Sequence, residues 1–190
     1  MNLNKLTLIY PKRELLSFKT KSLLYWKTDT HWNEYGGLIG YTSLVSEIQK
    51  DFPDIEIISE NKLDFREETR ATGDLLNMLS IENKQYENVY YMVPHLKLRK
   101  FVYEKNEGVK GVITKSEKKY KVLVFRDSFT DAMLPYLSET FGEVEYIWNH
   151  NFNSYQDKIR EYKPDIVIHE VVERYIDVLK IDTPKLEGEL

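Results

Sequence analysis

Residues 121–129 read KVLVFRDSF, and this stretch decides the fold. The four apolar residues from Val122 to Phe125 are typical of a strand that is buried on both faces. Ser128 follows the strand directly, at the point where a helix is expected to begin. We therefore predict a strand over 121–125 and a helix over about 129–141.

The same alternation continues toward the C-terminus. Strands that alternate with helices of this length indicate parallel βαβ units with helices covering the sheet. Active sites in such sheets lie at the carboxyl ends of the strands, where Ser128, Asn149 and Glu170 are placed. The predicted elements are strands over 144–148 and 166–169, a helix over 154–163 and a last helix from about Val171.

The N-terminal half is less regular. Apolar residues at helical spacing predict a helix over about 33–50, with Asn33 as its N-cap and Pro53 beyond its end. The other expected elements are an irregular lead-in over 1–32 with a short strand at 6–10, a weak strand at 55–58, a loop with a short helix over 61–82, and strands over 90–103 that end near 108–111.

Composition bounds the class of protein. The 190 residues, 42% of them apolar, suit one globular domain, and a net charge of −4 argues against a nucleic-acid partner. There is no cysteine, which excludes disulfides and thiolate metal sites. No run approaches the roughly 20 apolar residues of a membrane span, and residues 1–10 lack the pattern of a secretory signal. The sequence itself therefore assigns no compartment.

Residues 28–33 read TDTHWN and place an acid two residues before an imidazole. Because residues two apart in an extended segment point to the same side, Asp29 can orient the ring of His31. Together with the hydroxyl of Ser128 they supply the three parts of a serine acyl-transfer site. Their chain order is unusual but allowed, because geometry rather than order defines a triad.

Plainer readings remain open for the same residues. Ser128 can serve only as a helix N-cap, and a lone histidine is more often structural than catalytic. Asp29 and His31 with one more histidine would make a metal site, but the other histidines are scattered and show no ligand spacing. No Gly-rich phosphate loop is present, and we expect neither a metal nor a cofactor.

The motif of residues 28–33, followed by Gly36 and Gly37, resembles the DTHWN-type signature of the SGNH hydrolase-like domain in alginate O-acetyltransferases and related proteins. The resemblance covers roughly residues 20–178. Further matching stretches are 72–75 with 78–79, 125–129, 164–168 and 172–175.

This resemblance implies a flavodoxin-like three-layer α/β/α sandwich with a mainly parallel sheet, forming a single SGNH hydrolase-like domain over residues 1–190. Compared with the family, we expect the chain to lack the N-terminal anchor and the first strand–helix portion. The resemblance also implies Ser128 as nucleophile, His31 as base and Asp29 as its orienting partner. The family transfers or hydrolyses acetyl esters on polysaccharide hydroxyls outside the cytoplasm, commonly beside a membrane partner that exports acetyl groups.

Further site residues are predicted around this triad. The oxyanion candidates are the Ser128 backbone N–H, the Gly73 backbone and the Asn149 side chain. The substrate-binding candidates are Trp32, Tyr35 and Trp148 for stacking on sugars and Arg126 for an anionic sugar. The alternatives are core packing for any one of the three aromatic residues and covering the sheet edge for Arg126. We expect a serine-dependent O-acetyltransferase or acetylesterase, and the alternative is a non-catalytic domain of the same fold that binds polysaccharide or a partner.

Overall fold

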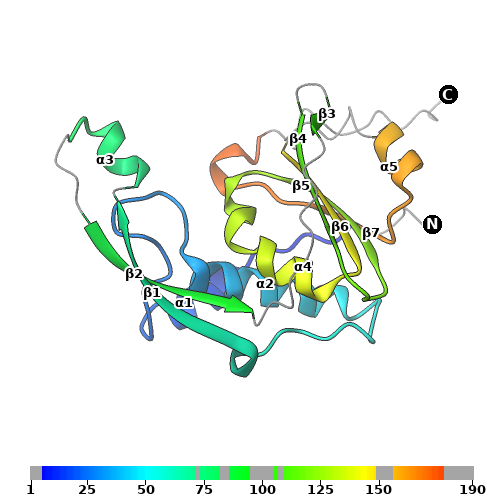
Figure 1. Ribbon diagram of the computed structural model, residues 1–190, viewed down its shortest axis with the longest axis horizontal. Helices are drawn as coiled ribbons and strands as arrows, with labels where there is room; N and C mark the ends of the chain where they lie inside the picture. The colour runs from blue at the N-terminus through cyan, green and yellow to red at the C-terminus, as the bar shows by residue number, and fades with distance from the viewer. Residues whose placement is uncertain are drawn as a thin grey trace. The chain divides into compact units, whose positions relative to one another are not determined.

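The strand–helix alternation predicted from residue 121 onward is present in the computed structural model, which describes residues 6–71, 73–81, 86–94, 105–106, 109–148 and 156–177. Strands β5 (Lys121–Arg126), β6 (Glu143–Trp148) and β7 (Ile166–His169) are parallel neighbours (Figure 1). The side chains from Val122 to Phe125 are at most 1% exposed, as expected for a strand covered on both faces. The predicted α/β class is therefore confirmed.

The chain divides into two compact units. Unit 1 consists of Met1–Leu98 and Thr130–Thr140, and unit 2 consists of Arg99–Phe129 and Phe141–Leu190. The second boundary along the chain, between Phe129 and Thr130, falls within the short 3₁₀ helix η2 (Ser128–Ala132).

Unit 2 is built on a mixed sheet with the strand order β3-β4-β6-β5-β7. The three strands β6, β5 and β7 run parallel, while β4 (Val109–Lys115) pairs antiparallel with β6 and with the two-residue β3 (Lys105–Asn106). The predicted parallel arrangement therefore holds for the centre of the sheet, and the edge beyond β6 is antiparallel.

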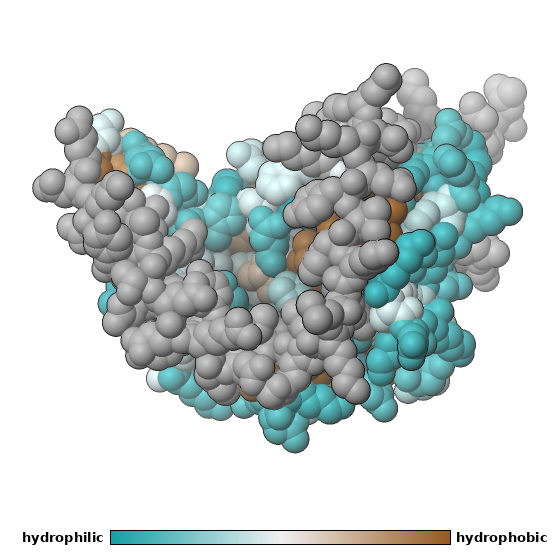
Figure 2. Space-filling model, viewed as in Figure 1, coloured by the Kyte–Doolittle hydropathy of each residue, from teal (hydrophilic) through white to brown (hydrophobic). Residues whose placement is uncertain are grey.

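Helix α5 (Gln156–Tyr162) covers one face of this sheet. Its residues Ile159 and Tyr162 pack against a buried cluster of Leu123, Phe125 and Ile147. The opposite side of the helix carries charged residues and forms part of the hydrophilic surface in Figure 2. The helix predicted over residues 154–163 is therefore present in the part that the structure describes, which begins at residue 156.

Unit 1 contains the predicted N-terminal helix, α2 (Glu34–Ile48). As expected, Asn33 caps it, and the Asn33 side chain accepts hydrogen bonds from the N–H groups of Tyr35 and Gly36, both at 3.0 Å. Helix α4 (Leu134–Thr140) packs on α2 through the hydroxyls of Tyr41 and Thr140, which are 2.6 Å apart.

A two-stranded ribbon completes unit 1. Strands β1 (Leu63–Ala71) and β2 (Tyr86–Pro94) pair antiparallel over nine residues, and α3 (Asp74–Met78) lies in the connection between them (Figure 1). The apolar side chains of Met78 and Leu79 are 69% and 68% exposed at the end of α3. The predicted short helix in this region is confirmed, but β1 lies where a loop was expected.

Two predicted strands are wrong. Residues Leu6 to Tyr10 form no strand, and Leu6 and Leu8 are 97% and 80% exposed. Residues 55–58 are irregular because the backbone N–H of Ile58 donates to the Tyr41 hydroxyl, at 3.0 Å, rather than to a neighbouring strand.

Two smaller differences concern helices. An unpredicted helix, α1 (Lys12–Phe18), lies in the N-terminal lead-in. In the described residues, the last predicted helix is only a 3₁₀ turn, η4 (Glu173–Tyr175). A second 3₁₀ turn, η1 (Glu60–Lys62), precedes β1. None of the helices in the described residues is long and apolar enough to span a membrane.

Candidate active site

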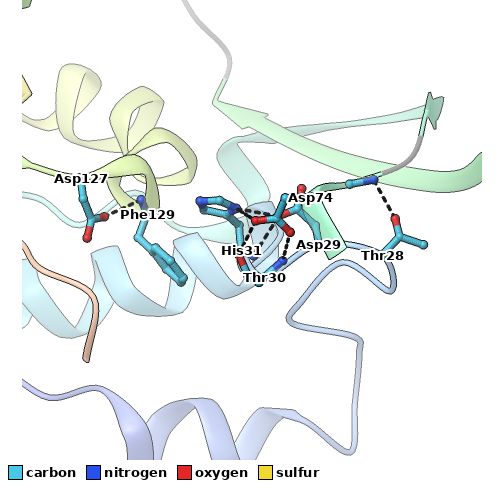
Figure 3. A network of polar contacts seen from close by, with 8 residues as sticks. Thr28, Asp29, Thr30, His31, Asp74, Asp127 and Phe129 are labelled. Carbon is cyan, nitrogen blue, oxygen red and sulfur yellow. Dashed lines mark hydrogen bonds and ion pairs between the residues drawn. The ribbon is translucent and has the colours of Figure 1, made fainter. Parts of the chain in front are cut away.

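Asp29 and His31, which the sequence pairs, are in direct contact in unit 1. The Nδ1 atom of His31 lies 2.6 Å from Oδ1 of Asp29, and the His31 backbone N–H donates to the same oxygen at 3.0 Å (Figure 3). Asp29 is buried, with 6% of its surface exposed, whereas the His31 side chain is 26% exposed. The predicted orienting contact between the acid and the imidazole is therefore present.

This contact decides which nitrogen of His31 can act as a base. An ionised carboxylate only accepts hydrogen bonds, so the Nδ1 atom facing Asp29 carries the ring proton in neutral His31. Nε2 is then the basic nitrogen, and it lies on the side of the ring away from Asp29 (Figure 3). A buried carboxylate on Nδ1 and a basic Nε2 are the arrangement that general-base catalysis by a histidine requires.

The segment after β1 holds the loop that carries Asp29. The Gly73 backbone N–H donates to the hydroxyl of Thr28 at 3.0 Å, and the Leu75 N–H donates to the Thr28 carbonyl at 3.1 Å. A Cβ atom on Gly73 would lie 2.4 Å from the Cβ of Asp29, so only glycine fits this close approach. Because the Gly73 N–H already donates to Thr28, we leave Gly73 out of the oxyanion hole proposed below.

Asp74 adds a second carboxylate at the same place. Its Oδ1 accepts from the Thr30 backbone N–H at 2.7 Å, and its Oδ2 accepts from the Thr30 hydroxyl at 2.6 Å. The same Oδ2 lies 3.8 Å from Nδ1 of His31. Sequence reasoning had matched residues 72–75 to the family but had given Asp74 no role, since its spacing of more than forty residues from His31 carries no local signal.

Ser128 lies in unit 2 at the start of η2, directly after the carboxyl end of β5. The preceding residue, Asp127, holds this turn, because its Oδ1 accepts from the Phe129 N–H at 2.7 Å (Figure 3). Its Oδ2 accepts from the Val172 N–H at 2.8 Å. The Asp127 N–H donates to Oε2 of Glu170 at 3.2 Å. The side chain that accepts from the first turn of η2 is thus that of Asp127, and Ser128 stands half-buried beside it.

Two of the predicted aromatic substrate contacts lie in unit 1. Trp32 is only 8% exposed, and its ring lies so close to Gly40 that a Cβ there would be 2.7 Å away. Trp32 therefore packs in the core of unit 1. Tyr35 is partly exposed, and its hydroxyl donates to Glu60 at 3.2 Å. Burial and the Glu60 carboxylate raise the pKa of Tyr35, so its phenol stays neutral.

The other predicted contacts follow the strand ends of unit 2. Arg126 is 8% exposed, donates to the Asp127 carbonyl at 3.1 Å and lies 4.8 Å from the ring centre of Trp148. Trp148 is 43% exposed and presents an aromatic surface. Asn149 lies outside the described residues.

The residues around His31 also have the composition of a weak cation site. Ligand atoms of Asp29, His31 and Asp74 all lie within 4.8 Å of one another, and this group includes no second histidine among the described residues. Both oxygens of Asp74 already accept from Thr30, and His31 Nδ1 bonds Asp29, which is the pattern of a hydrogen-bonded acid–imidazole pair. The expectation of no metal stays a prediction.

Comparison with known proteins identifies the kind of domain. The family model described as "SGNH hydrolase-like domain, acetyltransferase AlgX" matches residues 12–171, a span that runs through both units. The predicted SGNH hydrolase-like fold is thereby confirmed, and the single domain over residues 1–190 stays a prediction. No curated protein matches the chain in sequence.

Solved structures show the same fold at low sequence identity. A DHHW family protein from Eubacterium siraeum superposes with a TM-score of 0.62 at 16% identity, covering 88% of this chain and 67% of that one. Bacillus cereus PatB1 gives 0.56 at 15% identity, with coverages of 82% and 66%. The O-acetyltransferase domain of Pseudomonas putida AlgJ gives 0.52 at 16% identity, with coverages of 88% and 60%. The chain thus spans two thirds or less of the length of these proteins.

Proposed function

Because the chain belongs to the family of the SGNH hydrolase-like domain of acetyltransferase AlgX, we propose that it is a serine-dependent carbohydrate O-acetyltransferase or acetylesterase. The observation that carries the proposal is the 2.6 Å contact between Asp29 and His31, which makes Nε2 the basic nitrogen of the ring. In this proposal Ser128 is the nucleophile, His31 the general base and Asp29 the residue that orients the ring.

The first step forms an acetyl-serine. His31 Nε2 takes the proton of the Ser128 hydroxyl as its oxygen attacks the carbonyl carbon of a donor acetyl ester. The tetrahedral oxyanion accepts a hydrogen bond from the Ser128 backbone N–H, with Asn149 kept as a second candidate donor. When the intermediate collapses, the C–O bond of the donor breaks and the leaving oxygen takes the proton back from His31.

The second step releases the acetyl group. His31 Nε2 now takes a proton from a sugar hydroxyl, whose oxygen attacks the acetyl-serine and regenerates Ser128 with its proton. If water attacks instead, the product is acetate and the protein is an esterase. The two reactions share every protein residue named and differ only in the acceptor.

The substrate class and setting follow from the family. We infer a polysaccharide as the acceptor or substrate, at the cell surface or outside the cell, and a membrane protein that exports acetyl groups as the donor partner. Trp148, exposed at the end of β6, is the aromatic residue best suited to stack on a sugar ring. The AlgJ domain with the same fold is an O-acetyltransferase domain, which supports the transferase reading.

The test is covalent labelling with a fluorophosphonate, measured by intact-protein mass spectrometry. We expect one adduct on the wild type and none on Ser128→Ala or His31→Ala, because the serine reacts only when His31 removes its proton. Ser17→Ala is the matched control, since Ser17 is an exposed serine on α1 whose hydroxyl donates to the Glu14 carbonyl. This variant should label like the wild type.

Each other outcome changes the conclusion. No adduct on the folded wild type would contradict the enzyme and favour a binding domain of the same fold. If the wild type takes the adduct, acetyl transfer and ester hydrolysis are distinguished by incubating the protein with an aryl acetate, with and without an oligosaccharide. A transferase forms acetylated oligosaccharide, whereas an esterase forms only acetate.

A further inference from the structure

Asp74 is a carboxylate beside His31 for which the two steps above have no use. It is the first residue of α3, and both of its oxygens face the loop that carries Asp29 and His31 (Figure 3). Its side chain is 31% exposed, so water could solvate the carboxylate without these contacts to the loop. Its arrangement therefore calls for a function of its own.

The first effect of Asp74 is mechanical. Thr30 lies between Asp29 and His31, and Asp74 binds it twice, through the backbone N–H at 2.7 Å and the hydroxyl at 2.6 Å. Fixing both groups of the middle residue restricts rotation of the peptide units on either side of it. Residues 28–31 lie in no helix or strand. Backbone hydrogen bonds hold the two ends of the loop, since the Thr28 carbonyl accepts from the Leu75 N–H at 3.1 Å and the His31 carbonyl from the Trp26 N–H at 3.3 Å, and Asp74 holds Thr30 between them.

The second effect is electrostatic. Oδ2 of Asp74 lies 3.8 Å from Nδ1 of His31, on the ring nitrogen that also contacts Asp29. When Nε2 of His31 takes a proton, the positive charge spreads over both ring nitrogens. A second carboxylate within about 4 Å stabilises that cation, although screening by solvent weakens the effect of a partly exposed group.

We propose that Asp74 is a positioning residue for His31: it holds Thr30 so that the Nδ1–H of His31 stays on Asp29, and it adds a second negative charge beside the imidazolium. The part of this inference that concerns reaction rate rests on the function proposed above. The part that concerns the Nδ1–H of His31 does not.

Three variants separate the two effects. Asp74→Asn keeps the shape and both contacts with Thr30, because its amide oxygen can accept from the N–H and its amide group can donate to the hydroxyl; only the charge is lost. Thr30→Val keeps the charge and removes the hydroxyl contact, and Asp74→Ala removes both effects. The control is Asp157→Asn, the same exchange in the first turn of α5, where the exposed Asp157 forms an ion pair with Arg160.

The first measurement does not depend on catalysis. Nitrogen-15 NMR of the imidazole in the full chain reports which nitrogen of His31 carries the proton and how fast that proton exchanges. We expect a slowly exchanging Nδ1–H in the wild type, Asp74→Asn and Asp157→Asn. In Thr30→Val and Asp74→Ala we expect faster exchange and a mixture of both tautomers.

The second measurement is the rate of fluorophosphonate labelling at Ser128, with the melting temperature of each variant measured alongside. We expect the rate to fall about tenfold in Asp74→Asn at an unchanged melting temperature, and on the order of tenfold to a hundredfold in Asp74→Ala. A wild-type rate in Asp74→Asn would overturn the electrostatic part. A wild-type Nδ1–H in both Thr30→Val and Asp74→Ala would overturn the positioning part of the inference.

These results also separate this inference from the proposed function. If the wild type takes no adduct, the proposed function fails and the electrostatic part falls with it. The NMR comparison then decides by itself whether Asp74 positions His31.

Discussion

The Asp–His loop of unit 1 and the serine turn of unit 2 are held in place by different means. The loop of residues 28–31 is held by the side chain of Asp74 and the backbone N–H of Gly73, both more than forty residues away in the sequence. In the turn, Ser128 follows β5, which is hydrogen-bonded to β6 on one side and β7 on the other. The loop therefore depends on a segment that is distant in the sequence, whereas the turn follows a strand that the sheet holds on both sides.

This difference indicates which substitutions disorder each region. At the serine turn, Asp127 accepts from backbone N–H groups of Phe129 and Val172, and Glu170 donates its own N–H to the Phe125 carbonyl. The sheet therefore continues to hold the strand when one side chain is lost. At the Asp–His loop, a single substitution in the segment after β1 removes a large part of what orders it.

The largest effect is expected from Gly73→Ala, which attacks the loop. The new Cβ would lie 2.4 Å from the Cβ of Asp29 and 2.5 Å from the Thr28 carbonyl oxygen, so the two segments must separate. We expect a loss of about 1–3 kcal/mol in the free energy of unfolding. Labelling of Ser128 should slow on the order of a hundredfold, because His31 moves.

The control for Gly73→Ala is Gly111→Ala in β4. A Cβ on Gly111 would meet only the Tyr146 carbonyl oxygen, at 3.6 Å, which is an ordinary contact. The free energy of unfolding in denaturant and the rate of labelling are measured for both variants. Equal effects of the two exchanges would show that the close approach at Gly73 does not order the loop.

A smaller effect is expected from Asp127→Ala, which attacks the serine turn. The N–H groups of Phe129 and Val172 lose their acceptor, and each buried N–H left unpaired costs about 1–3 kcal/mol unless water replaces it. Labelling should fall by about tenfold, less than for Gly73→Ala, because β5 still holds Ser128 near its place.

Asp165→Ala is the matched control at the other end of the same strand. Oδ2 of Asp165 accepts from the Lys121 N–H at 2.8 Å, so the variant loses the same kind of contact at the amino end of β5. It should lower the melting temperature and leave the labelling rate unchanged. If Asp165→Ala labels as slowly as Asp127→Ala, a general loss of stability explains the slower labelling of both variants.

A third prediction concerns stability at high pH. Burial and the neighbouring Glu34 and Tyr41 raise the pKa of Tyr136 above the value of 10.0 of an unfolded tyrosine. A raised folded pKa means that the stability from the neutral phenol is fully present below pH 10 and is lost as the pH rises above 10. Each such tyrosine removes up to about 1.4 kcal/mol per pH unit in that range.

Urea unfolding between pH 9 and pH 11 measures this loss, and Tyr136→Phe should flatten the curve. Tyr162 in unit 2 has its pKa raised by burial and by Glu143, so Tyr162→Phe tests whether the second unit behaves alike. A Tyr136→Phe curve parallel to that of the wild type would contradict the assignment of the alkaline loss to Tyr136.

The smallest effect is expected from removal of divalent cations. If Asp29, His31 and Asp74 work as hydrogen-bonded side chains, dialysis against EDTA should change the labelling rate by less than about twofold. The same sample with Zn²⁺ added back is the control. Loss of labelling in EDTA and recovery with Zn²⁺ would instead identify the three side chains as a metal site.

The serine turn and the Asp–His loop also differ in how far the sequence predicts them. The serine turn was predictable, because the apolar run of β5 and the residues after it lie next to one another in the chain. The contact between Asp29 and His31 was also predictable, since two residues of spacing are enough to bring them together. The role of Asp74 was not, because it depends on a ribbon whose first strand has no apolar alternation.

That strand shows the physical reason. Residues 64–71 read DFREETRA, which has few apolar residues and no period of two, so the sequence indicated a loop. The strand forms because β2 pairs with it over nine residues, and backbone hydrogen bonds do not depend on the side-chain pattern. The reverse holds at Leu6 to Tyr10, where a strand pattern meets no partner among the described residues.

The sequence by itself determined the α/β class, the parallel strands from residue 121 onward, the cap at Asn33 and the pairing of Asp29 with His31, because each depends on residues close together in the chain. Only the tertiary structure decided that Trp32 is a core residue and that Gly73 and Asp74 hold the Asp–His loop. These features depend on which distant segments of the chain come into contact, and a local pattern of side chains does not predict that contact.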